Sequence, residues 1–139
     1  MSDTKYGKHL TTDCVHMGKA GTIVSSTRHL ESFGGGNFSL DCIHIKAPKL
    51  MIKQPHQHEF DQYLCFFSAN PDDPADFDAE IELSLGEESE KQIITRPTVA
   101  HVPAGLYHGP LNFARINKPV MFVDVAITGK YGRVGNTAD

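Results

Sequence analysis

Hydrophobic and polar side chains alternate along several short segments of this chain, as they do in β-strands with one buried face. The clearest case is residues 79–86, where Ile81, Leu83 and Leu85 share one face and acidic or hydroxyl side chains occupy the other. No segment shows the spacing of an amphipathic helix longer than a turn or two. We therefore expect strands at 22–26, 38–47, 51–66, 79–86, 91–95, 98–102 and 120–127.

Glycine and proline divide the chain into these short segments. The twelve glycines and eight prolines are spread through the sequence, and many short strands without intervening helices are typical of a β-sandwich or β-barrel. Turns are expected at residues 34–36 and 86–89, and a surface loop at 70–78. The 139 residues predict one all-β domain, with an N-terminal arm over 1–21, a folded body over 22–128 and a C-terminal tail over 129–139.

Charge and composition exclude several kinds of partner. The formal net charge is −4, with no run of basic residues, which argues against a nucleic-acid partner. No apolar run approaches the roughly 20 residues needed to cross a bilayer, so no membrane partner is expected. The three cysteines have no paired spacing, and the first ten residues lack the apolar core of a secretion signal. A cytoplasmic location is therefore expected.

Two of the eight histidines, His56 and His58, stand two residues apart. On a strand this spacing places them on one face together with Phe60 and Gln62. Two imidazoles so placed can reach one metal ion at about 2.0–2.2 Å. A pair of histidines at this spacing is weak evidence alone, because such pairs are common by chance in a histidine-rich chain.

A second pattern follows some fifty residues later, in the segment 103–112. Pro103 and Gly105 are expected to form a turn, His108 follows that turn, and Asn112 lies four residues further on. This pattern is rare by chance, on the order of once per thousand chains of this length. Together with the earlier histidine pair it predicts a metal site built from two distant segments.

These two patterns resemble the two conserved motifs of the cupin superfamily. The resemblance covers residues from about 51 to 124 and implies a cupin-type jelly-roll β-barrel, also called a double-stranded β-helix. It further implies one divalent metal ion per chain near an open end of the barrel, held by His56, His58, His108 and the residue at position 62. Cupins commonly pair through their outer strands, so a homodimer is implied too.

The chain departs from the family motif at position 62, where Gln62 replaces the usual glutamate. A neutral amide oxygen can still bind a metal, though more weakly than a carboxylate. By strand parity Glu59 and Asp61 should face outward, unless a β-bulge turns Asp61 inward. Asn112 is expected to fix the turn around the site by hydrogen bonds.

Three functions remain open from the sequence. The first is a metal-dependent enzyme acting on a small oxygenated molecule: a dioxygenase, or a lyase, isomerase or decarboxylase that works through a metal-bound enolate. Its metal would be Fe, Mn, Ni or Zn, and His44 or His101 would be the general base. The second is a non-catalytic module that binds a small ligand or a metal. The third is a barrel that has lost its metal.

Overall fold

The computed structural model describes residues 4–12, 14–17, 23–26, 36–128 and 134–135. These ranges contain a single 3-10 turn, η1 (Gly7–His9), and otherwise only strands. The strands are β1 (Val15–Met17), β2 (Ile23–Ser26), β3 (Ser39–Ile45), β4 (Lys49–Ile52), β5 (His56–Gln57), β6 (Gln62–Ser68), β7 (Ala79–Leu85), β8 (Glu90–Ile94), β9 (Thr98–Val102), β10 (His108–Ile116), β11 (Val120–Ala126) and β12 (Val134–Gly135).

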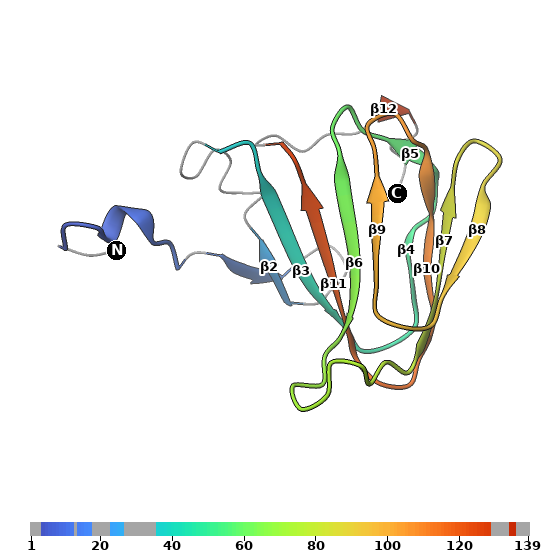
Figure 1. Cartoon of the computed structure of the whole chain (residues 1–139), viewed down its shortest axis with the longest axis horizontal. Helices are drawn as coiled ribbons and strands as arrows, with labels where there is room; N and C mark the ends of the chain where they lie inside the picture. Colours follow the sequence, from blue (N-terminus) through green and yellow to red (C-terminus); the bar gives the residue numbers. More distant parts are fainter. Residues whose placement is uncertain (1–3, 13, 18–22, 27–35, 129–133, 136–139) are drawn as a thin grey trace.

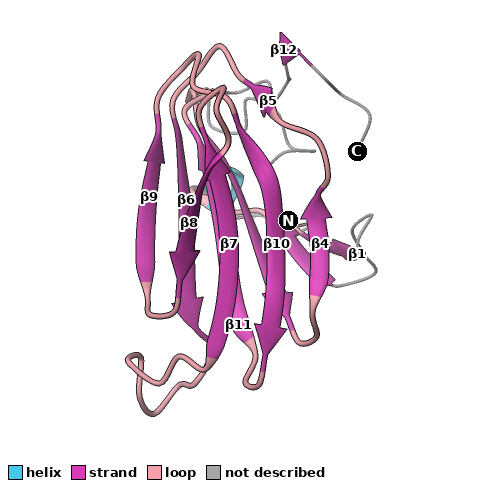
Figure 2. Ribbon diagram, turned by 90° about the vertical axis from the view of Figure 1, so that its right-hand side faces the viewer, coloured by secondary structure: helices cyan, strands magenta, loops and turns pink. Residues whose placement is uncertain are grey.

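The strands form two antiparallel sheets that pack face to face (Figures 1 and 2). The first sheet has the order β1-β2-β3-β11-β6-β9, and the second has the order β12-β5-β10-β7-β8, with β4 also pairing to β10. Neighbouring strands are therefore often distant in sequence, as in a jelly roll. The prediction of an all-β jelly-roll barrel is confirmed.

Three phenylalanines join the two sheets at the centre of the core. Phe66 of β6 and Phe122 of β11 come from the first sheet, and Phe113 of β10 comes from the second. Their ring centroids lie 5.2–6.1 Å apart, within the range of favourable aromatic contacts. Aliphatic side chains of both inner faces surround them: Ile45, Leu64, Ile81, Leu83, Leu111 and Val120.

The longest strand, β10, is one that the hydrophobic pattern does not predict. Its second and third residues are Gly109 and Pro110, and proline cannot donate a hydrogen bond to a neighbouring strand. The pairing of β10 with β7 accordingly shifts register between His108 and Leu111. Beyond the shift, Leu111 and Phe113 are buried with the partly exposed Asn112 between them, and a second register shift follows between Phe113 and Arg115.

The prediction of one strand through the histidine pair and Gln62 is wrong. His56 belongs to β5 and pairs with His108 of β10, whereas Gln62 begins β6 and pairs with Val102 of β9. The chain therefore crosses from one sheet to the other over residues 58–61. The physical reason is that this crossing bonds to the turn after β9 instead of to a strand, since the amide of Gly105 donates to the carbonyl of His58 at 2.9 Å.

Both ends of the chain contribute to the sheets more than the sequence predicts. β1 lies within the predicted arm and pairs with β2, and β12 lies within the predicted tail and pairs with β5. Gly135 of β12 stands directly opposite His56. In the described residues no helix has the length and apolar character that a bilayer-spanning segment needs.

Candidate metal centre

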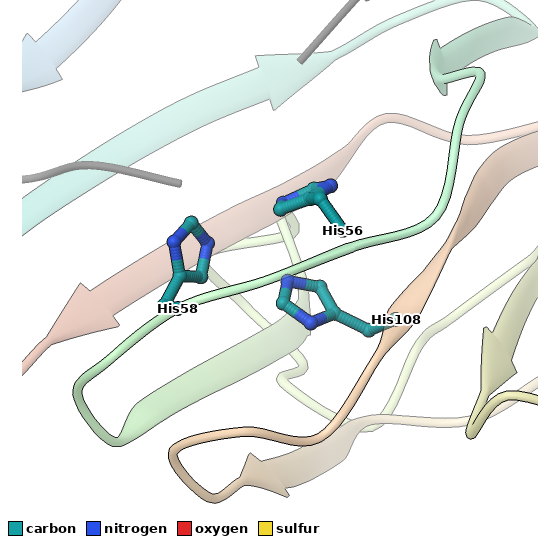
Figure 3. Close-up of side chains that lie close together, drawn as sticks. All are labelled: His56, His58 and His108. Carbon is teal, nitrogen blue, oxygen red and sulfur yellow. The ribbon is translucent and has the colours of Figure 1, made fainter. Parts of the chain in front are cut away.

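Three buried histidines gather between the two sheets at one end of the barrel. His56 lies on β5, His58 begins the segment that crosses between the sheets, and His108 lies at the start of β10 (Figure 3). Their potential ligand nitrogens all lie within 4.8 Å of one another. Each residue is at most 2% exposed. The structure thus brings together the three histidines that the sequence predicts to meet.

Backbone carbonyls hold two of these rings through Nδ1. His108 Nδ1 lies 3.1 Å from the carbonyl oxygen of Leu106, and His56 Nδ1 lies 3.4 Å from that of Gln54. A carbonyl can only accept a hydrogen bond, so Nδ1 carries the proton in each case. This tautomer leaves Nε2 as the lone-pair nitrogen, which is how metal-binding histidines are commonly oriented.

Gly109 allows the two histidine segments to approach each other. Its φ is +104°, a backbone conformation that side chains disfavour. A Cβ at this position would lie 3.0 Å from Ile52 and 3.1 Å from the carbonyl oxygen of Gln54. Glycine is therefore needed next to His108 so that β10 can pack against the segment that leads into His56.

Gln62 is buried at the same end of the barrel and is held by an aspartate that the sequence analysis missed. Gln62 Nε2 donates to Asp124 Oδ1 at 2.5 Å. Because a carboxylate only accepts, this contact fixes which end of the amide faces Asp124. The other end, Oε1, is buried and makes no hydrogen bond within the described part of the chain. Asp124 thereby leaves a carbonyl-type oxygen available inside the barrel.

Asp124 is part of a polar patch on the inner face of the first sheet. Asp41 of β3 stands directly opposite Asp124 of β11, and two residues further along β11 Ala126 stands between Ser39 and Gln62. Ser39, Asp41, Gln62 and Asp124 are all buried. The signal that could have found Asp124 is its position, since it shares the inward face of β11 with Val120, Phe122 and Ala126.

His44 and His101, the two general-base candidates from the sequence, do not join the histidine cluster. On β3 and β9 the side chains alternate, and the inward positions belong to Ile45 and Val102. His44 and His101 are exposed on the opposite face. His44 also lies at the far end of its sheet, because it pairs with Met121 while Gln62 pairs with Ala126.

Asp61 faces outward, the orientation that the sequence predicts, although residues 58–61 form no strand, and it bonds His101. His101 Nε2 lies 3.0 Å from Asp61 Oδ2, and the amide of Ala104 donates to Asp61 Oδ1 at 3.1 Å. The hydrogen bond from His101, together with that from Ala104, holds the pKa of Asp61 below its usual value.

Asn112 is a further correction: it bonds Glu82 on β7 at 3.2 Å and does not fix the turn.

The donor set fits a first-row transition metal. Three imidazole nitrogens favour Zn, Fe, Ni or Cu over the hard ions Mg and Ca, which prefer oxygen ligands. Three close, buried imidazoles also lose their hydration on folding, so a cation among them offsets that cost. Gln62 Oε1 is a neutral oxygen of the kind that can complete such a set.

Comparison with known proteins identifies the fold. No family model matches the sequence, and no curated protein matches it significantly. Among solved structures, an uncharacterised double-stranded β-helix protein from Klebsiella pneumoniae superposes with a TM-score of 0.55 at 17% identity, covering 88% of this chain and 90% of that one. KdgF from a Halomonas species gives 0.51 at 14% identity, covering 81% and 84%.

A third similar structure is an oxalate decarboxylase from Bacillus subtilis with Mn(II) centres. The TM-score is 0.53 at 14% identity, and the match covers 88% of this chain but 30% of the larger enzyme. The chain therefore has the double-stranded β-helix fold of the cupins. At these identities the likeness establishes the fold, and the function has to be argued from the site.

Proposed function

We propose that this protein is a metal-dependent cupin enzyme that acts on a small oxygenated molecule. The observation that carries the proposal is the cluster of His56, His58 and His108, with ligand nitrogens within 4.8 Å of one another. Three protein ligands with a weak fourth leave coordination positions open, as catalytic metal sites do. The metal, when bound, supplies Lewis-acid or redox chemistry to a substrate oxygen at those positions.

Gln62 is the fourth group in this proposal. Asp124 holds its amide so that Oε1 is presented inside the barrel, where it either completes the metal site or accepts a hydrogen bond from the substrate. A neutral fourth ligand leaves the site with one more positive charge than a glutamate would. That extra charge favours binding of a substrate oxygen that carries negative charge.

The polar patch on the inner face of the first sheet indicates the kind of substrate. Carboxylates and an amide oxygen are hydrogen-bond acceptors, so Asp41, Asp124 and Gln62 suit a molecule with hydroxyl groups. His44 and His101 lie on the outer face and cannot reach a substrate inside the barrel. We therefore assign the role of general base to the buried carboxylates Asp41 and Asp124. The expected substrate is therefore a small hydroxylated molecule with one oxygen to place on the metal.

The experiment is a metal-dependent activity screen. The metal-loaded protein, its chelator-treated form and a His108→Ala variant are each incubated with a panel of small hydroxy acids, keto acids and sugars, and products are followed by NMR. Turnover that needs both the metal and His108 supports the enzyme. A compound that raises the melting temperature of the loaded protein without being converted contradicts catalysis and favours the alternative of a non-catalytic binding module.

A further inference from the structure

Two hydrogen bonds connect the crossing segment 58–61 to the turn that precedes His108. The amide of Gly105 donates to the carbonyl of His58 at 2.9 Å, and the amide of Ala104 donates to Asp61 Oδ1 at 3.1 Å. The turn itself is closed by the amide of Leu106, which donates to the carbonyl of Pro103 at 3.1 Å. The segments that carry His58 and His108 are thus joined directly, outside any strand pairing.

Asp61 is the side chain at this junction. Its Oδ2 lies 3.0 Å from His101 Nε2 on β9, and its backbone carbonyl accepts from the amide of Ile127 at 3.0 Å. The His101 ring is in turn stacked on Tyr63 of β6, with centroids 5.0 Å apart. One carboxylate therefore bonds to both β9 and the turn after it.

We propose that Asp61 is a positioning residue that holds His58 and His108 at the separation needed to bind one metal ion. The inference rests on the proposed metal function and adds a residue that is not itself a ligand. Asp61 points to the outside, while the histidines point inward from the same segments. Its bond to Ala104 fixes the turn, and the turn sets where β10 and its first residue, His108, begin.

The geometry favours this role over a general contribution to stability. Asp61 is about half exposed, with 47% of its side chain accessible, and His101 is similarly exposed at 49%. Exposed ion pairs contribute little to folding stability. Groups that orient metal ligands, by contrast, typically change metal affinity about 10–100-fold when they are removed. Metal affinity should therefore respond to Asp61 far more than the melting temperature does.

The test compares Asp61→Ala, Asp61→Asn and Glu59→Ala for Zn(II) affinity by competition with a chromophoric chelator. Asp61→Ala should weaken Zn(II) binding at least about tenfold. Asp61→Asn keeps an acceptor for Ala104 and a donor for a neutral His101, so it should stay within about threefold of wild type. Glu59 is an exposed carboxylate in the same segment, so Glu59→Ala has the same charge change and should bind Zn(II) like wild type.

A second readout in the metal-free protein separates this proposal from the proposed function. Amide exchange of Gly105 should become at least about tenfold faster in Asp61→Ala than in Glu59→Ala, because the turn loosens. Equal Zn(II) affinity in Asp61→Ala and wild type, or an equal loss in Glu59→Ala, would overturn the positioning role. If wild type binds no metal while Gly105 exchange still depends on Asp61, the proposed metal function fails. The role of Asp61 in joining residues 58–61 to the turn before His108 would still be supported.

Discussion

Gln62 and Asp124 form a buried hydrogen bond between β6 and β11, with Gln62 Nε2 donating to Asp124 Oδ1 at 2.5 Å. The bond holds the glutamine that stands at the position of the glutamate in the cupin motif. Asp124 already stands opposite the buried Asp41, so a glutamate at position 62 would bury a further carboxylate against Asp124, and the charges would repel each other. The neutral amide avoids this repulsion, and Asp124 in return orients the amide oxygen.

This pairing predicts that the amide at position 62 and the carboxylate at position 124 can be swapped with little loss of stability. Gln62→Glu alone should destabilise the protein by about 1–3 kcal/mol, because it buries a further carboxylate against Asp124 and removes the amide donor of the hydrogen bond. The double variant Gln62→Glu with Asp124→Asn restores one donor and one acceptor and should recover most of that loss. Urea unfolding of the metal-free proteins measures both values. A double variant no more stable than Gln62→Glu would contradict the pairing.

A second prediction concerns the glycine beside His108. Gly109→Ala should cost roughly 1–3 kcal/mol, because φ at this residue is +104° and the new Cβ would meet Ile52. Relieving this clash would displace the adjacent residue His108, so the affinity for metal should fall as well. Gly36→Ala is the matched control, because Gly36 has nothing within 4 Å of its Cβ position. Equal effects of the two substitutions on the free energy of unfolding would show that close packing at Gly109 is unimportant.

The free energy of unfolding is predicted to depend on acid pH through two carboxylates at the end of the barrel opposite to the histidines. Arg115 beside Asp78, and Asn70 with Lys118 beside Asp76, hold the pKa of these carboxyls below the usual 3.8. A lowered folded-state pKa gives stabilisation that is present above the unfolded-state pKa and lost as the pH falls through the folded-state value. Stability should therefore decline as the pH falls below about 4.

Two variants check this expectation by thermal unfolding between pH 7 and pH 2.5. Asp78→Asn removes one of these carboxylates and should narrow the difference in melting temperature between neutral and acid pH. Asp72→Asn removes a carboxylate of the same loop that bonds no cationic side chain in the described part of the chain, and it should leave the difference as in wild type. If Asp78→Asn shows the same difference in melting temperature as wild type, the acid-sensitive contacts lie elsewhere.

The sequence predicts the fold well because the strand pattern and the two motifs agree. The alternation over residues 79–83 and the two histidine motifs are properties of short segments, and both are present in the structure, although Ser84 is buried and Leu85 is partly exposed. The pattern fails at β10, where Gly109 and Pro110 interrupt the alternation. A break of that kind is indistinguishable from a turn until the partner strand is known.

The parts of the site that sequence reasoning missed depend on pairing between distant strands. Asp124 meets Gln62 across two strands that are 62 residues apart in the chain, and no local spacing encodes that contact. His101 is a candidate base because it lies just before the predicted turn, yet the alternation of β9 places it on the outer face, where it bonds Asp61. The homodimer implied by the family resemblance stays a prediction.

The most direct test of the central claim is the metal content of the untagged protein, purified without chelators and measured beside three variants. We expect close to one Fe, Mn, Ni or Zn per chain in wild type and in His44→Ala, whose histidine is exposed on the outer face. The metal should be lost from both His56→Ala and His108→Ala. A wild-type protein without metal after reconstitution, or a His108→Ala variant that retains it, would contradict a metal centre at these histidines.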